Sequence, residues 1–326
     1  MTHAEERIAP DVARPSTELA PVVAFAYKRL GHLRRMVDSL LGNAESTGTH
    51  LSIYCDAARK PEDLEAVQSV RRYVSSIRGF ASVTPVFRTD NFGLAKSIIS
   101  GVSEMLSSHD RVIVLEDDLI LSPYFLRYMN DGLRLYAQDD QVASIHGYCY
   151  PADSPLPETF FLRGADCWGW ATWGRAWRHF RPDGKALLDE LRLERLTRRF
   201  DFDGTFDFTQ MLAAQVGGQN DSWAIRWHAT CFLANRLTLY PGHSLVHNGG
   251  FDSTGQHCDS TSAFDQIVSQ GPVDVARLPL AESERARSAF IEFFRSIRAP
   301  LVTRLRSRLR HVIGTSVGAF RSSKAN

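Results

Sequence analysis

The stretch RVIVLEDDLILSPYF, residues 111–125, decides how this chain is read, because three acids interrupt an apolar run. Residues 112–115 are strand-like, Glu116, Asp117 and Asp118 follow, and apolar residues resume at once. A carboxylate pressed against apolar neighbours is unstable unless a positive group neutralises it. The stretch therefore predicts a buried strand whose end meets a cation or a ligand that carries one.

Outward from this stretch, strand-like and helix-like segments alternate between residues 21 and 150. Strands are expected at residues 21–27, 51–56, 83–89, 111–115 and 141–148. Helical spacing of apolar residues is seen in Leu33, Met36, Val37 and Leu40, and again in Leu94, Ile98, Val102 and Leu106. This alternation predicts an α/β, Rossmann-like fold with a mostly parallel sheet flanked by helices. Ligands of such sheets bind at the carboxyl ends of the strands, where Arg29, Asp56, Asp90 and the three acids fall.

Composition sets broad limits on function. The chain has 326 residues and a formal net charge of +1, which gives no argument for a nucleic-acid partner. Five scattered cysteines without a CxxC pair suit a reducing cytosol. No apolar run approaches the ~20 residues that span a bilayer, and residues 1–20 have no apolar signal-peptide region. We expect a disordered lead-in at 1–20 and a cytoplasmic location.

The pattern of residue types along the chain changes after about residue 151. We expect residues 21–150 to form an α/β ligand-binding half, 151–262 the catalytic half of the same domain, and 263–326 a C-terminal helical extension. All six tryptophans lie between 168 and 227, and Trp173, Trp177 and Trp227 are expected in the core. Arginines near the C-terminus alternate with leucines, which indicates a solvated covering helix or peripheral docking on an anionic membrane. These arginines are Arg304, Arg306, Arg308 and Arg310.

A divalent cation is the physical solution that we favour for the acids. Mg²⁺ or Mn²⁺ is held by one or two carboxylates together with substrate phosphates, and a nucleotide diphosphate would supply those phosphates. The alternative is that Asp117 or Asp118 caps the helix that follows. Ser122, with Pro123 at the first helical position, suits that cap better and leaves the acids available.

Several separated motifs, between about residues 22 and 258, resemble GT-A glycosyltransferases, and most of all the N-acetylglucosaminyltransferase I type. The EDDL stretch with SPYF resembles the metal motif of this family. AFAYKR at 24–29 resembles the first nucleotide-contacting strand end, and CWGWATWGRAW at 167–177 resembles a Gly-x-Gly-Trp loop with its following helix. NDSWAIRW at 220–227 and LVHNGGFDSTGQHC at 245–258 resemble the acidic segment before a tryptophan and a late His-Gly segment.

The resemblance implies roles for the residues at the strand ends. Asp118 would be the direct metal ligand, Asp117 would lie near the ribose or donor sugar, and Glu116 would contact the sugar side. Arg29 would meet phosphate or base, with a solvated basic residue as the alternative. Asp56 would contact the uracil or ribose, or would instead cap a loop. Asp90 is expected to be the N-cap of its helix, and a contact of Lys96 with the donor is a further alternative with no better support.

The resemblance also suggests a catalytic base. Asp221 is our candidate, since it lies in the segment that resembles the family's acid pair. This sequence departs from the family there, with Ser222 in place of the second acid, so Asp207 is an alternative base. Trp168 is expected on the donor side and Trp223 on the acceptor side, because indole faces stack on sugar rings.

The glycine-rich segments suggest further contacts. Gly164 and Gly169 would let a loop backbone approach the donor. His247 and His257 are candidates for completing the metal shell, with Asp252 orienting one of them. A polar bystander role is about as well supported for these histidines.

The predicted function is a metal-dependent, inverting glycosyltransferase that moves a sugar from a nucleotide-sugar, with a UDP-sugar favoured, to a hydroxyl of a glycan or lipid-linked acceptor. Its hypothesised role is in surface polysaccharide or glycolipid assembly. One alternative is a sugar-1-phosphate nucleotidyltransferase, which usually needs a glycine-rich loop that AFAYKRLGH lacks. Another is a noncatalytic carbohydrate-binding relative. The sequence leaves retaining chemistry open as well.

Overall fold

The computed structural model describes residues 18–251 and 262–298 of the chain. The strands are β1 (Val22–Ala26), β2 (His50–Cys55), β3 (Ser82–Phe87), β4 (Arg111–Glu116), β5 (Leu119–Leu121), β6 (Val142–His146), β7 (Thr159–Arg163), β8 (Trp170–Trp173), β9 (Leu237–Pro241) and β10 (Val246–Asn248). The α-helices are α1 (Leu30–Leu41), α2 (Leu64–Ser76), α3 (Gly93–Leu106), α4 (Phe125–Leu135), α5 (Gly174–Trp177), α6 (Gly184–Leu193), α7 (Thr197–Phe200), α8 (Phe208–Val216), α9 (Trp223–Leu233) and α10 (Glu284–Ile297). Short 3₁₀ helices are η1 (Ala44–Gly48), η2 (Pro61–Asp63) and η3 (Gly249–Phe251).

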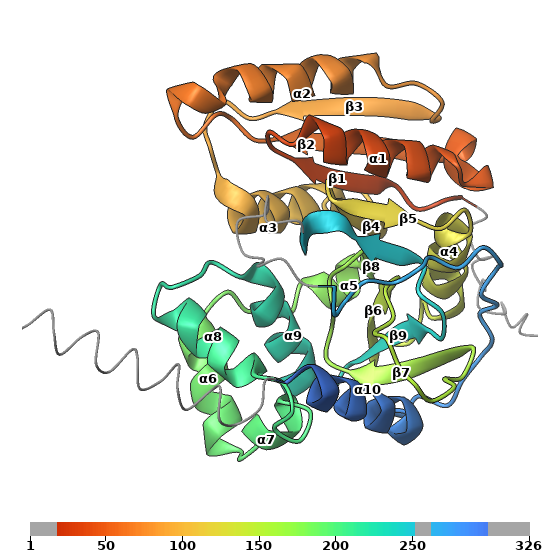
Figure 1. Cartoon of the computed structure of the whole chain (residues 1–326), viewed down its shortest axis with the longest axis vertical. Helices are drawn as coiled ribbons and strands as arrows, with labels where there is room; N and C mark the ends of the chain where they lie inside the picture. The colour runs from red at the N-terminus through yellow and green to blue at the C-terminus, as the bar shows by residue number, and fades with distance from the viewer. Residues whose placement is uncertain (1–17, 252–261, 299–326) are drawn as a thin grey trace, which may run out of the picture.

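Eight strands form one sheet in the order β3-β2-β1-β4-β8-β6-β9-β7, and β5 pairs with β10 in a separate two-stranded ribbon. The pairs β2–β3, β1–β2, β1–β4 and β6–β9 are parallel, and the three pairs made by β8 and β7 are antiparallel. The expected α/β fold with a mostly parallel sheet is therefore confirmed (Figure 1). The carboxyl ends of β1, β2, β3 and β4 share one edge of the sheet, where ligands of such folds bind.

Helices cover both faces of this sheet, as the alternation of side chains along its strands requires. In β1, Val22 and Ala24 belong to one hydrophobic cluster, while Val23 and Phe25 belong to the other. The first cluster contains residues of α1, α2, α4 and α10, and the second contains residues of α3, α5 and α9. Strands that are buried on both faces explain why residues 111–116 lack the apolar–polar alternation of a half-exposed strand.

The sequence predicted the face of one helix well and that of another only in part. In α1 the residues at helical spacing, Leu33 to Leu40, are all buried as expected. In α3, Ile98 and Val102 are buried as expected, but Leu94, in the first turn of the helix, is 40% exposed. Gly101 lies on the buried face as well, where a Cβ would come within 2.6 Å of Phe25 Cε1. A glycine at this position therefore allows α3 to pack closely on β1.

In the second half of the sheet, sequence analysis predicted β6 but not β7, β8 or β9. Residues 170–173 belong to the segment that resembled a loop and its following helix, but they form strand β8, which pairs antiparallel with both β4 and β6. Long-range pairing on both edges decides this conformation, because the run WATW fits either period. The expectation that Trp173, Trp177 and Trp227 pack in the core is confirmed, since each is at most 6% exposed.

The two ends of the described chain are tied to the core. The expected disordered lead-in is wrong for its last residue, because Ala20 is buried and its amide donates to Asn130 Oδ1 at 2.8 Å. Residues 1–17 and 299–326, with the four C-terminal arginines, lie outside the described residues. The helix α10, within the expected helical extension, packs its buried Phe290 and Phe294 against Tyr150.

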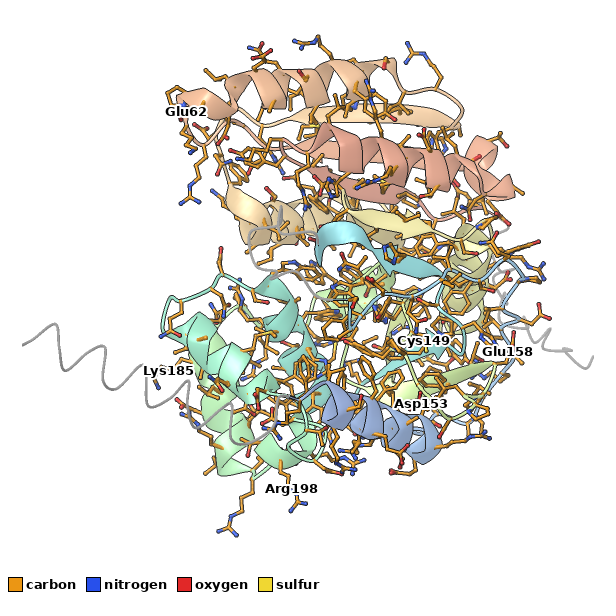
Figure 2. All side chains as sticks on the ribbon, viewed as in Figure 1. Glu62, Cys149, Asp153, Glu158, Lys185 and Arg198 are labelled. Carbon is orange, nitrogen blue, oxygen red and sulfur yellow. The ribbon has the colours of Figure 1, made fainter. Side chains whose placement is uncertain are left out.

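The surface carries mixed charges. Charged side chains such as Glu62 of η2, Lys185 of α6 and Arg198 of α7 project outward (Figure 2). No helix in the described ranges is long and apolar enough to cross a membrane.

Candidate nucleotide-sugar site

The three acids lie where the sequence placed them, at the carboxyl end of a central buried strand. Glu116 is the last residue of β4 and pairs with Phe25 of the parallel strand β1. Asp117 and Asp118 then form the tight turn into β5. The helix after β5 begins at Phe125, and its N-cap residue has no side-chain cap, so the expected Ser122 cap is two residues early. The Ser122 hydroxyl accepts from the Tyr124 amide at 3.2 Å.

The acid pair is neutralised by a side chain of the protein itself. Arg29 follows β1 and immediately precedes α1, and its Nη2 donates to Asp117 Oδ1 and, at 2.7 Å, to Asp118 Oδ2. The side chains of Arg29, Asp117 and Asp118 are 22%, 6% and 15% exposed. Arg29 is therefore not the freely solvated residue of the alternative reading. Sequence analysis selected all three residues but did not predict their contact.

Burial and mutual repulsion alter the acidity of this group. Burial, and then the charges of Asp118 and Asp117, raise the pKa of Glu116 to about 8. Burial also raises the pKa of Asp117, to about 6, against the lowering effect of Arg29. For Arg29, burial lowers the pKa, but the charges of Asp117 and Asp118 outweigh it and hold the pKa above its ordinary value. Arg29 therefore offsets only part of the effect of burial on these carboxyl groups.

The late glycine-rich segment reaches the same acids through a β-ribbon. Strand β10 pairs antiparallel with β5, so Asn248 lies opposite Leu119, directly after Asp118. The Gly249 amide donates to the Asp118 carbonyl at 2.8 Å. A Cβ on Gly250 would collide with Asp118 Oδ2, so a larger residue there would displace this carboxylate. Sequence analysis singled out this segment for its histidines, whereas its Gly249 amide is what contacts Asp118.

Asp56 has a structural role that accounts for its position. Its carboxylate accepts from the Phe92 and Gly93 amides at 2.8 and 2.9 Å and from the Ala57 amide at 3.0 Å. The side chain therefore caps α3, as the alternative reading allowed in general terms. Asp90 was expected to cap this helix and does not, since its carboxylate contacts the Thr89 hydroxyl and is exposed. A contact of Asp56 with the donor stays a prediction.

The Asp221 segment has one exposed acid and one buried aromatic ring. Ser222 caps α9 by accepting from the Ile225 amide at 3.3 Å, and the Asp221 side chain is 71% exposed. Trp223 is only 3% exposed and stacks on Trp170 at 5.4 Å. This burial contradicts the expected acceptor contact of Trp223, because neither indole face is open to a sugar.

The same stack locates the start of α9. Trp170 pairs with Val114, two residues before Glu116, so its contact with Trp223 holds α9 beside β8 and the end of β4. Asp221 precedes this helix, is open to solvent and pairs with Arg226 at 3.4 Å. The other acid considered, Asp207, is 48% exposed and pairs with Arg298 at 3.0 Å.

The tryptophan loop is held by a buried histidine that the sequence analysis did not single out. The Trp168 amide donates to Nε2 of His146 at 3.1 Å, and the Trp168 ring lies edge-on to Tyr148 at 4.7 Å. Burial lowers the pKa of His146 to about 4. Its position at the end of β6 was the available signal. Trp168 is half-buried, and its donor contact stays a prediction.

The two loop glycines approach the protein rather than a ligand. A Cβ on Gly164, whose φ is +102°, would come within 2.6 Å of His228 Cε1. A Cβ on Gly169, whose φ is +64°, would come within 2.8 Å of Val246 Cγ2. The expectation that these glycines admit the donor is therefore not supported, since packing already requires both.

The acids fit a divalent cation in donor chemistry but do not form a complete cage. Carboxylate oxygens suit Mg²⁺ or Mn²⁺, and such ions take remaining ligands from phosphates. No three His, Cys, Asp or Glu side chains within residues 18–251 and 262–298 converge as metal ligands. His247 directs Nδ1 to the Gln266 carbonyl at 3.1 Å, which fixes the proton on Nδ1. His257 and Asp252 lie outside the described residues.

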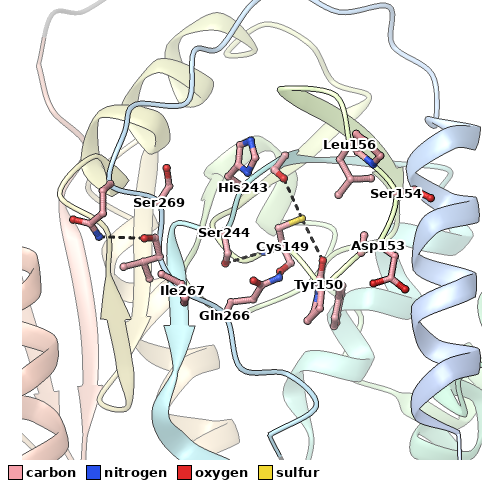
Figure 3. Close-up of a pocket in the computed structure, with 16 residues that line it drawn as sticks. Cys149, Tyr150, Asp153, Ser154, Leu156, His243, Ser244, Gln266, Ile267 and Ser269 are labelled. Atoms are coloured by element: carbon pink, nitrogen blue, oxygen red, sulfur yellow. Dashed lines mark hydrogen bonds between the residues drawn. The ribbon is translucent and has the colours of Figure 1, made fainter.

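A separate hollow of about 610 Å³ lies beyond the ends of β6 and β9 (Figure 3). It is lined by the loop from Cys149 to Leu156, by Gly242 to Ser244, and by Gln266 to Gln270. Its lining is mostly polar loop, and none of the acids or Arg29 belongs to it.

Comparison with protein families finds no match, and comparison with curated proteins finds no similar sequence. Among solved structures, a mannosyltransferase from Pyrobaculum calidifontis in complex with GDP-Man and Mn²⁺ is similar over 45% of this chain and 39% of its own, with 14% identity and a TM-score of 0.31. S. aureus TarS is similar over 45% of this chain and 25% of its own, with 12% identity and a TM-score of 0.30.

A UDP-glucose pyrophosphorylase complexed with UDP-glucose is similar over 68% of this chain and 90% of its own, with 12% identity and a TM-score of 0.34. Likenesses this slight establish no activity. The aligned parts also span well under half of the mannosyltransferase and of TarS.

Proposed function

We propose that this protein is a glycosyltransferase that binds a nucleotide-sugar, with a UDP-sugar favoured, together with Mn²⁺ or Mg²⁺ at the carboxyl edge of β1 and β4. The observation that carries the proposal is the convergence of Arg29, the acids 116–118 and the Gly249–Gly250 backbone at this edge. These segments are far apart in the sequence, and buried acids that share one internal cation are the kind of site that a metal–diphosphate complex completes.

The proposed roles follow from the positions of the side chains. Asp118 is the more exposed acid of the pair and would hold the metal, while Arg29 supplies a planar donor for phosphate oxygens. The bound metal would supply positive charge to the departing diphosphate. Glu116, the last residue of β4, would contact the donor on its sugar side.

The proposed base is Asp221, at the N-terminus of α9. Its carboxylate would accept the proton of the acceptor hydroxyl as that oxygen attacks the anomeric carbon, which is the general-base role of an inverting transfer. The proposed acceptor is a hydroxyl of a glycan or of a lipid-linked sugar. Trp168, half-buried above Tyr148, is the indole that we place on the donor side.

A sugar-1-phosphate nucleotidyltransferase is the main competing function. The turn from β1 to α1 argues against it, because residues 27–29 pass directly into the helix without a glycine-rich phosphate loop. Release of pyrophosphate from a nucleoside triphosphate and a sugar 1-phosphate would favour this alternative.

Thermal unfolding with ligands tests the proposed function. UDP, GDP, dTDP and CMP would each be added with and without Mn²⁺ to wild type and to Asp118→Asn. A ligand at a hundredfold its Kd stabilises the folded state by about 2.7 kcal/mol. We expect one nucleotide to stabilise the wild type in the presence of Mn²⁺ and to lose this effect in the variant. No response to any nucleotide would remove the main support for the proposal.

A further inference from the structure

The contact between Arg29 and the two aspartates places a positive charge where a cation would act. One nitrogen, Nη2, donates to both Asp117 and Asp118, and the three side chains are at most 22% exposed. Partial burial strengthens such charge-assisted contacts relative to an exposed ion pair. The protein thus folds with an internal cation on its acid pair.

We propose that Arg29 is the resident counter-ion of Asp117 and Asp118 and keeps a divalent cation out of the acid pair until a nucleotide diphosphate binds. The metal and diphosphate parts of this inference rest on the proposed function. The competition follows from Coulomb's law, since a divalent ion at Asp118 would lie beside a guanidinium of the same sign. Nucleotide-free protein should therefore bind Mn²⁺ weakly.

The guanidinium also has an unused donor that explains how a diphosphate would release the acids. Arg29 Nη1 is buried and has no hydrogen-bond partner among residues 18–251 and 262–298, and a buried donor without a partner is unfavourable. Phosphate oxygens match the two-nitrogen edge of a guanidinium. A diphosphate that engages this edge would draw Arg29 from Asp118 and leave that carboxylate to the metal.

The neighbouring basic residue does not share this position. Lys28 precedes Arg29 in the chain, but its Nζ pairs with Asp63 Oδ1 at 2.7 Å, on the side of the β2–α2 connection. Lys28 is therefore a matched control, because it is a cation adjacent in sequence whose partner is a different acid.

Mn²⁺ binding measured by electron paramagnetic resonance tests the inference without any measurement of activity. The proteins are wild type, Arg29→Gln, Arg29→Lys, Lys28→Gln and Asp118→Asn, first without nucleotide. We expect Arg29→Gln to bind Mn²⁺ about tenfold more tightly than wild type, from removal of one like charge beside a partly buried site. Arg29→Lys and Lys28→Gln should stay close to wild type, and Asp118→Asn should bind more weakly than wild type.

Each outcome bears on the inference. Equal Mn²⁺ affinity of folded Arg29→Gln and wild type would overturn it, and so would equal tightening in Arg29→Lys, which would show that the charge is not the cause. If Arg29→Gln does not fold, tight Mn²⁺ binding by the unaltered protein without nucleotide would overturn it, and weak binding that UDP tightens would support it. A tighter Arg29→Gln with no nucleotide binding in any protein would uphold the counter-ion role and refute the proposed function.

Discussion

Removal of the Asp56 carboxylate should destabilise the protein through helix α3, whatever ligand the site binds. Asp56 is 7% exposed, and its two oxygens accept three backbone amides, two of them at the start of α3. Asp56→Ala would leave these amides without their acceptor. Loss of a helix cap costs about 0.5–2 kcal/mol, and buried donors without partners cost about 1–3 kcal/mol. We expect the free energy of unfolding to fall by about 3 kcal/mol.

Urea unfolding followed by tryptophan fluorescence suits this measurement. The indole Nε1 of Trp177 donates to Ser103 Oγ of α3 at 2.9 Å, so the signal reports on the contact of this helix with the core. A shift of the midpoint at unchanged slope indicates a change in stability. The variant should unfold at a lower urea concentration.

Asp90→Ala is the matched control, because Asp90 is the acid next to α3 that sequence alone favours as the cap. Its side chain is exposed and contacts only the Thr89 hydroxyl among the hydrogen bonds of the described residues. We expect a change within about 0.5 kcal/mol. The reasoning is refuted if Asp56→Ala is as stable as wild type, or if Asp90→Ala is destabilised to the same extent.

Two further predictions concern the loops beside the site. Gly164→Ala should lower the free energy of unfolding by more than about 2 kcal/mol, because the φ of Gly164 is +102° and the new Cβ would strike His228. Gly204→Ala is the control, since its φ is +79° but its surroundings are open, and it should cost only the backbone strain of about 1 kcal/mol. Equal urea midpoints for the two variants would contradict this prediction. Burial lowers the pKa of His146 to about 4, whereas a histidine in the unfolded chain titrates near about 6.5. Below about pH 6.5 the unfolded state therefore binds more protons than the folded state, and the free energy of unfolding decreases as the pH falls. Between pH 7 and 5 this loss of stability is about 2 kcal/mol. In His146→Gln the amide oxygen can still accept the Trp168 N–H. Urea unfolding of this variant should therefore show a pH dependence that is weaker by about 2 kcal/mol than that of wild type.

The sequence by itself determined the class of fold and the position of the acids. Alternating apolar strands and helices predicted the parallel half of the sheet, and the interrupted run at 111–125 placed Glu116 at a strand end. Both are properties of local periodicity, which burial imposes on each segment separately. The same rule failed at Trp170, where a short aromatic run fits helix and strand equally and pairing with β4 and β6 decided the outcome.

Only the tertiary structure decided which partner each charged side chain takes. Arg29 pairs with acids 88 and 89 positions away, and Asp56 accepts amides 36 and 37 positions away. The burial of Trp223 on Trp170 likewise turned an expected sugar contact into core packing. Contacts of this kind depend on how segments distant in sequence meet at one edge of the sheet. Residue type and spacing within a segment do not encode that meeting, so the sequence identified the groups and the fold chose their partners.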